Sequence, residues 1–124
     1  MQETNANNFA KHIFRAYDIR GEAHTELSVD LVYKIGRVFG SFVLESGNNE
    51  IIVSRDPRLS SPELSKSLQK GILDSGCNIC DLGITPTPVL YFATHYLDTN
   101  CGVMLTGSHN PKHHNGLKTI INGK

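Results

Sequence analysis

The chain has 124 residues, enough for the hydrophobic core of one domain but not of two. Its 12 lysines and arginines balance its 12 aspartates and glutamates, so it lacks the basic excess of a protein that binds nucleic acid or a membrane surface. No apolar run approaches the ~20 residues that span a bilayer, and the polar residues 1–8 do not resemble a signal peptide. We therefore expect a cytoplasmic protein with no nucleic-acid and no membrane partner.

The chain has three cysteines, and this odd number argues against a disulfide framework. Cys77 and Cys80 have the C-x-x-C spacing of redox and zinc motifs, but they lie in an expected strand, where residues three apart point to opposite faces. Only Cys101 could add another thiolate, which excludes a four-cysteine zinc site.

The first elements are a strand and a long helix. Loose alternation of apolar and charged residues over 12–21 predicts a strand and a turn. A helix is predicted over 28–47, where Ser28 can cap the start. We expect Gly36 and Gly40 to let this helix pack closely against a sheet. Apolar side chains that recur at three- and four-residue steps form its buried stripe: Leu31, Val32, Ile35, Phe39, Phe42 and Val43.

Two strand–helix units follow this helix. The β-branched run 50–54 predicts a strand, and the helix after it begins at Ser61 and continues to residue 76. The next strand covers 78–82, and it leads to a helix over 87–97 that Thr87 can cap.

Two apolar runs near the end predict the last strands, over 102–105 and 117–121, on either side of a polar loop. The order of helices and strands predicts an α/β fold, a three-layer αβα sandwich around a mixed, mostly parallel sheet. Ligands of such folds bind beyond the carboxyl ends of the strands. The segments 55–58 and 85–88 are expected at that edge with the polar loop, mainly in structural roles such as Arg–Asp pairing and helix starts.

The polar loop concentrates conformational constraints around one serine. Gly107 frees the backbone just before Ser108, Pro111 fixes the exit, and Asn115–Gly116 is expected to form a turn. A serine is a poor nucleophile unless a neighbouring group takes its proton or stabilises its charge. The loop is therefore a candidate for nucleophilic or phosphate chemistry.

Two motifs resemble a known family. The loop residues 106–111 (Thr-Gly-Ser-His-Asn-Pro) and 115–118 (Asn-Gly-Leu-Lys) resemble the phosphoserine loop of the α-D-phosphohexomutases. Residues 14–21 (Phe-Arg-Ala-Tyr-Asp-Ile-Arg-Gly) resemble the N-terminal signature of the phosphomannomutase/phosphoglucomutase branch. One departure is His114, which stands where the family commonly has an aromatic residue.

The resemblance implies a reaction in which Ser108 carries a phosphoryl group. This group is exchanged with hexose 1- and 6-phosphates through a bisphosphosugar intermediate. Arg20 and Lys118 are implied as the cations that balance the phosphate charge. Lys118, Arg20 and His109 are all candidates for the general acid or base.

The resemblance also implies the remaining contacts. Tyr17, His109 and Asn110 are expected to bind the substrate, which is mannose or glucose 1- or 6-phosphate. An oxygen of the Ser108 phosphate is expected to bind Mg2+, whose other ligands lie outside this chain.

We expect residues 1–124 to be the N-terminal, phosphoserine-bearing domain of a four-domain phosphohexomutase. The other domains of the same polypeptide, which the resemblance makes its partners, are absent from this chain. The isolated piece is therefore expected to have no appreciable mutase activity.

Three other interpretations of the serine loop compete with this one. A serine hydrolase elbow needs glycines two residues before and after the serine, where this chain has Thr106 and Asn110. A zinc site at His109, His113 and His114 lacks a carboxylate or thiolate within the loop. A non-catalytic phosphate-binding domain remains open.

Overall fold

Among the residues that the structure describes, six strands form one mixed sheet in the order β1-β2-β6-β5-β3-β4. The structure is a computed structural model, and it describes residues 14–15, 18–23, 27–97, 99–107 and 114–120. The strands are β1 (Phe14–Arg15), β2 (Asp18–Glu22), β3 (Glu50–Arg55), β4 (Asn78–Ile84), β5 (Gly102–Leu105) and β6 (His114–Ile120). The helices are α2 (Val29–Glu45), α3 (Ser61–Asp74) and α4 (Thr87–Tyr96).

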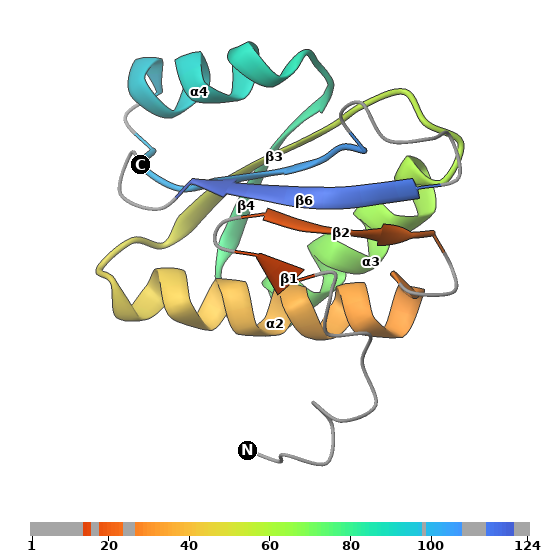
Figure 1. The fold of residues 1–124 in the computed structure, drawn as a ribbon. Coiled ribbons are helices and arrows are strands. Elements are labelled where there is room, and N and C mark those ends of the chain that lie inside the picture. Colours follow the sequence, from red (N-terminus) through yellow and green to blue (C-terminus); the bar gives the residue numbers. More distant parts are fainter. Residues whose placement is uncertain (1–13, 16–17, 24–26, 98, 108–113, 121–124) are drawn as a thin grey trace.

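The predicted fold class is confirmed. β3 pairs in parallel with β4 and β5, whereas β6 is antiparallel to both β5 and β2. Consequently β2, β3, β4 and β5 run in one direction, and β1 and β6 run in the other. Helices α2 and α3 cover one face of the sheet and α4 covers the other, which makes the three αβα layers (Figure 1).

Alternate residues of the central strands fill two cores. Ile51 and Val53 of β3 enter the core under α2 and α3, whereas Ile52 enters the core under α4 beside Leu90. Strand β5 repeats this alternation, with Met104 on the α4 side. Burying an aliphatic side chain of this size contributes about 1.5–3 kcal/mol, so both faces hold the central strands in register.

The predicted N-terminal cap is confirmed for α2 but not for α4. Ser28 caps α2, because its Oγ accepts a hydrogen bond from the amide of Leu31 at 3.1 Å. Thr87 was expected to cap α4, but the cap position belongs to Pro86 and no side chain makes a capping hydrogen bond. Pro86 has the extended backbone that a helix entry needs, and its carbonyl accepts from the amide of Val89.

The expectation that Gly36 and Gly40 pack against the sheet is wrong, because both face α3. A Cβ atom at Gly36 would meet the carbonyl oxygen of Leu68 and the Cα atom of Gly71. A Cβ atom at Gly40 would meet the side chain of Ser75. These glycines therefore bring two helices, rather than a helix and a sheet, into close contact.

The last strand begins earlier than predicted, and the expected turn at Asn115–Gly116 is wrong. Both residues lie inside β6, where Asn115 is the register partner of Gly21 and Gly116 that of Arg20. Pairing with β2 keeps this segment extended, so tertiary contacts override the local turn preference of Asn-Gly.

Candidate functional site

The carboxyl ends of β3 and β5 lie side by side. Arg55 is the register partner of Leu105, and the amide of Asp56 donates to the carbonyl of Leu105 at 2.9 Å. From the β4 side, the amide of Thr85 donates to the carbonyl of Arg55 at 3.1 Å. The predicted meeting of polar segments at one sheet edge is confirmed for the described residues, and this edge forms the right-hand side of Figure 1.

Asp56 is the centre of the hydrogen bonds at this edge. Its Oδ1 accepts from the amide of Arg58 at 3.1 Å and from the hydroxyl of Ser61 at 2.8 Å. Its Oδ2 accepts from Nε of Arg58 and from the amide of Gly107, both at 3.0 Å. Asp56 thus ties the segment after β3 to the residue that precedes Ser108.

These hydrogen bonds lower the pKa of the Asp56 carboxyl. Burial alone would raise the pKa, but donors from Ser61, from the amides of Arg58 and Gly107 and from the Arg58 guanidinium outweigh it. The carboxylate is therefore ionised at neutral pH and can hold the Arg58 cation in place.

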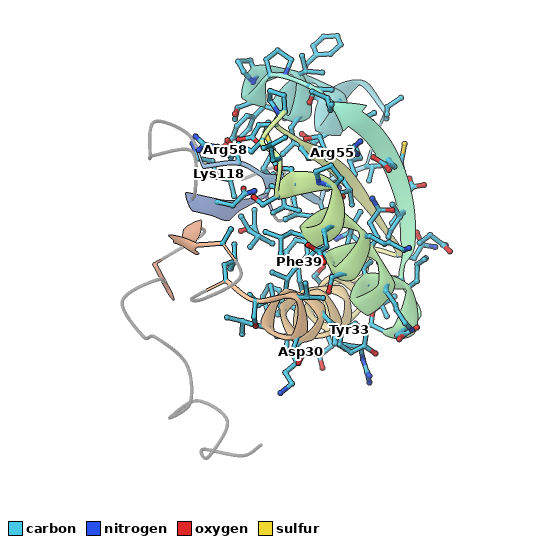
Figure 2. All side chains as sticks on the ribbon, turned by 90° about the vertical axis from the view of Figure 1, so that its right-hand side faces the viewer. Asp30, Tyr33, Phe39, Arg55, Arg58 and Lys118 are labelled. Carbon is cyan, nitrogen blue, oxygen red and sulfur yellow. The ribbon has the colours of Figure 1, made fainter. Side chains whose placement is uncertain are left out.

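The guanidinium of Arg58 lies directly against Gly107. A Cβ atom at Gly107 would overlap with Cζ, Nε and Nη1 of Arg58, so only glycine leaves room for this contact. The Asp56 and Arg58 side chains are each 14% exposed, so the pair is largely shielded from water. Figure 2 looks onto this edge of the sheet and labels Arg58 and Lys118 in the same part of the view.

Asn115 anchors the other end of the segment that contains Ser108. Its side-chain amide donates to the hydroxyls of Ser60 at 2.9 Å and Ser61 at 3.0 Å. The amide of Thr106, just after β5, also donates to the carbonyl of Gly116 in β6 at 2.9 Å, so the two chain segments stay paired up to the start of the loop. The segment 56–61 therefore holds the chain on both sides of residues 108–113.

The backbone brings Lys118 and Arg20 to neighbouring positions. Lys118 is half-buried in β6 and is the register partner of Asp18, while Arg20 pairs with Gly116, two residues before Lys118. Strands β2 and β6 thus bring the backbones of these two residues to neighbouring positions of the sheet.

The other predicted site residues lie outside the described residues. These are Tyr17, Ser108, His109 and Asn110, together with His113 of the zinc alternative. Their roles stay predictions, which rest on the loop sequence and on the described residues that hold its two ends.

Within the described part of the chain, three buried side-chain atoms at the strand ends have no hydrogen-bond partner: Oγ of Ser54, Nε of Arg55 and Oγ1 of Thr85. Such atoms are rare in folded proteins, so each one calls for an explanation. Their position at the ends of β3 and β4 marks the same edge as the Asp56 hydrogen bonds.

Metal ligands do not gather in the described part of the chain. Among those residues, no three histidine, cysteine, aspartate or glutamate side chains come together as a candidate metal site. The described residues therefore do not by themselves fit a magnesium ion, and the expected ligand, a phosphate on Ser108, lies outside them.

Cys77 and Cys80 lie on opposite sides of the sheet, as predicted, but Cys77 precedes β4 and only Cys80 lies in the strand. Cys77 packs in the core under α2 and α3, whereas Cys80 packs against the core under α4, so the two point to opposite faces. Both of these and the buried Cys101 are free thiols. Burial raises the pKa of the Cys77 thiol, which opposes the formation of a reactive thiolate.

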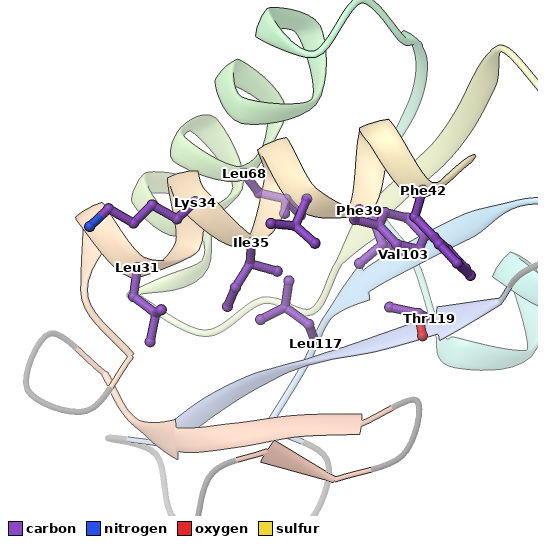
Figure 3. Close-up of a pocket in the computed structure, with 10 residues that line it drawn as sticks. Leu31, Lys34, Ile35, Phe39, Phe42, Leu68, Val103, Leu117 and Thr119 are labelled. Carbon is purple, nitrogen blue, oxygen red and sulfur yellow. The ribbon is translucent and has the colours of Figure 1, made fainter. Parts of the chain in front are cut away.

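An apolar hollow of about 330 Å³ lies between α2 and the sheet (Figure 3). Phe42, predicted to lie in the buried stripe of α2, is 50% exposed at this hollow. Its lining is apolar except for Lys34 and Thr119: Leu31, Ile35, Val38, Phe39, Phe42, Leu68, Val103 and Leu117. Such a surface does not suit a sugar phosphate.

The described residues define an αβα domain whose polar segments meet at the carboxyl edge of the sheet, beside a serine loop. No helix among them is long and apolar enough to cross a membrane. Residues 11–124 match the family described as phosphoglucomutase/phosphomannomutase, alpha/beta/alpha domain I. The chain belongs to this family and is its domain I.

Curated relatives and solved structures agree with this assignment. The chain is 48% identical over 124 residues to a phosphomannomutase/phosphoglucomutase of Pseudomonas aeruginosa, covering all of this chain and 27% of the relative. It is 45% identical over 116 residues to a phosphoglucomutase of Neisseria meningitidis, covering 94% of this chain and 25% of the relative. The chain thus spans about a quarter of the length of these relatives.

A solved structure has the same fold. A phosphoglucomutase/phosphomannomutase family protein from Burkholderia thailandensis superposes with a TM-score of 0.86 at 40% sequence identity. The match covers 93% of this chain and 27% of that chain.

Sequence reasoning missed how Asp56 and Arg58 act on the serine loop. The pattern Arg-Asp-Pro-Arg was interpreted as structural pairing, and the Asp56–Arg58 ion pair at 3.0 Å confirms that part. The link from Asp56 to Gly107 joins residues 51 positions apart, so no local spacing reveals it. The available signal was an Asp-x-Arg sequence directly after a buried strand at the ligand-binding edge.

Proposed function

We propose that this chain is the phosphoserine-bearing domain of a phosphohexomutase that interconverts hexose 1- and 6-phosphates, with Ser108 carrying the exchanged phosphoryl group. Membership of the phosphoglucomutase/phosphomannomutase family supports the reaction class. The observation that carries the proposal is the anchoring of both ends of the Ser108 segment to residues 56–61. A nucleophile that must donate and recover a phosphoryl group needs a fixed position, because phosphoryl transfer depends mainly on positioning and charge stabilisation.

The proposed transfer balances as follows. A sugar hydroxyl oxygen bonds to the phosphorus atom while the bond from phosphorus to Oγ of Ser108 breaks. The proton of the sugar hydroxyl ends on the serine oxygen, carried by a general acid and base for which Lys118, Arg20 and His109 are candidates. The resulting bisphosphosugar returns its other phosphate to Ser108, and the isomerised sugar phosphate leaves.

The charges near the loop suit this reaction. A phosphoserine carries about −1.5 to −2 charges at neutral pH and presents three acceptor oxygens. Lys118 and Arg20 are proposed to supply the positive charge, and their neighbouring backbone positions on β6 and β2 support this. Tyr17, His109 and Asn110 are proposed to contact the sugar phosphate.

A magnesium ion is part of the proposal, bound through a Ser108 phosphate oxygen. It would neutralise charge on the transferred group. Its remaining ligands, and the sites that choose between mannose and glucose phosphates, are assigned to the other three domains of the polypeptide. The cytoplasmic location stays a prediction from the sequence.

The test is the change Ser108→Ala in the full-length polypeptide that contains this chain. We expect mutase turnover to fall by about 10⁴-fold or more, because the group that forms the covalent intermediate is removed. The control Ser41→Ala, at an exposed position of α2, should leave turnover unchanged.

The phosphate itself provides a second measurement. Intact mass and peptide mapping of the full-length protein purified from cells should locate a phosphate on Ser108, and the Ser108→Ala variant should lack it. Normal turnover in the alanine variant would overturn the proposal. Appreciable turnover by the isolated 124-residue chain would contradict the assignment of essential parts to other domains.

A further inference from the structure

The contact between Arg58 and Gly107 gives Arg58 a position that its pairing with Asp56 alone does not explain. The guanidinium lies against the Cα atom of Gly107, where a Cβ atom would displace it. Gly107 is bonded to Ser108, so the plane of the cation lies one residue from the proposed phosphoserine. A guanidinium presents several N–H donors in one plane, a geometry that matches phosphate oxygens.

Asp56 fixes this arrangement from the other side. One carboxylate oxygen, Oδ2, accepts from both Nε of Arg58 and the amide of Gly107, at 3.0 Å each. The same atom therefore sets the position of the cation and of the backbone that leads to Ser108. Because both side chains are only 14% exposed, water weakens this coupling less than it would at an open surface.

The position of Arg58 complements those of the other cations. Lys118 lies on β6, the strand that follows the loop in the chain. Arg20 lies on β2, which pairs with β6. Arg58 lies at the other end of the loop, against Gly107, which is the last described residue after β5. Arg58 is thus a cation beside the residue that precedes Ser108, and positive charge near Ser108 would favour a phosphate dianion there.

We infer that Arg58 is a phosphate-binding residue of the serine loop and that Asp56 is the positioning residue that aims it. The inference rests on the proposed function, since it assumes a phosphoserine at position 108. It adds a third cation, from the segment between β3 and α3, to the two that the sequence motifs supply.

The test uses the 124-residue chain with phosphoserine installed at position 108 during synthesis, so that the result does not depend on turnover. The titration of the phosphate is followed by ³¹P NMR. We expect Arg58→Gln to raise the second pKa of the phosphoserine, ordinarily about 6, by about half a unit or more, because a nearby cation favours the dianion. Arg58→Lys, which keeps the charge but loses the planar donor set, should cause a smaller rise.

Arg37→Gln is the matched control. Arg37 is exposed on α2, where it donates to the hydroxyl of Tyr33, and its loss should leave the phosphate titration unchanged. Thermal melting of each variant checks that the fold persists. A phosphoserine that titrates alike in the wild-type chain and in a folded Arg58→Gln variant would overturn the inference.

A second measurement tests the same inference in the wild-type chain, so it does not depend on whether the Arg58→Gln variant folds. In the wild-type chain, the ¹H–¹⁵N resonance of Nε of Arg58 should shift as the installed phosphate titrates, and it should not shift when position 108 is serine. An Arg58 Nε chemical shift that does not change as the phosphate titrates would also overturn the inference. The proposed function fails on different grounds, namely an active Ser108→Ala variant or a cellular protein without phosphate at Ser108.

Discussion

Asn115 is a buried amide that joins β6 to the start of α3. Its side chain is inaccessible to solvent, its Nδ2 donates to the hydroxyls of Ser60 and Ser61, and its Oδ1 accepts from the amide of Gly116 at 2.9 Å. Both ends of the amide are thus satisfied, so this residue contributes stability instead of the penalty of an unpaired buried group. It also fixes where β6 begins relative to the serine loop.

The change Asn115→Ala should lower the free energy of unfolding by about 1–3 kcal/mol, because two serine hydroxyls lose a buried donor and a small cavity forms. Urea denaturation of the 124-residue chain measures this difference. Asn100→Ala, at an exposed position before β5, is the control and should change stability by less than about 0.5 kcal/mol. Equal stability of the two variants would show that the Asn115 hydrogen bonds contribute nothing net.

At the scale of elements, the contact between α2 and α3 depends on glycines from both helices. A Cβ atom at Gly36 would meet the Leu68 carbonyl oxygen, and one at Gly71 would meet the carbonyl oxygen of Tyr33. The obstructing atoms belong to backbone, which cannot rotate away as a side chain can. The close crossing is reinforced at the surface, where the Tyr33 hydroxyl donates to Asp74 at 2.6 Å.

Gly36→Ala should therefore destabilise the chain, although alanine is the better helix former. The gain in helix propensity is about 1 kcal/mol, whereas separating two packed helices costs about 1–3 kcal/mol or more. We expect a net loss in the free energy of unfolding, measured by urea denaturation. Ser41→Ala, exposed on the same helix, should be neutral or slightly stabilising; a stabilised Gly36→Ala variant would contradict the close contact.

The elements themselves were largely predictable from sequence. Periodicity located α2 and the Ser28 cap, and the apolar runs located β3 and β5, because these signals are local. The partner of Gly36 and the strand state of Asn115 depend on residues more than thirty positions away, so they could not be predicted. In the candidate site, the motif residues were identifiable by resemblance, whereas the Asp56–Gly107 link requires the folded sheet.

At the scale of the whole molecule, the sheet separates two cores, and its carboxyl edge holds the ionised Asp56. A carboxyl whose pKa is lower in the folded state than in the unfolded state stabilises the fold above its unfolded pKa. That stability is lost as the pH falls through the folded pKa. The pKa of Asp74 is lowered as well, by hydrogen bonds from Tyr33 and Lys70, but this carboxylate is exposed to solvent, which screens its interactions.

The free energy of unfolding should accordingly fall as the pH drops below about 4, the ordinary pKa of an aspartate. Asp56→Asn should be less stable at neutral pH and should lose less stability on acidification. The measurement is urea denaturation at neutral and acidic pH. Ser41→Ala, at an exposed position of α2, should keep the wild-type acid dependence; an unchanged acid dependence in Asp56→Asn would contradict the assigned role of this carboxylate.

Strand β4 is the outermost strand on one side of the described sheet, and it departs from regular geometry there. Its register with β3 shifts between Val53 and Ser54, and Gly83 has a φ of 76°. The amide of Gly83 donates a hydrogen bond to Oδ1 of the charged Asp81 at 2.8 Å. A strand from another molecule that approached this edge would meet an irregular row of backbone donors and a negative charge. The edge of β4 therefore disfavours the edge-to-edge strand pairing that leads to fibrils.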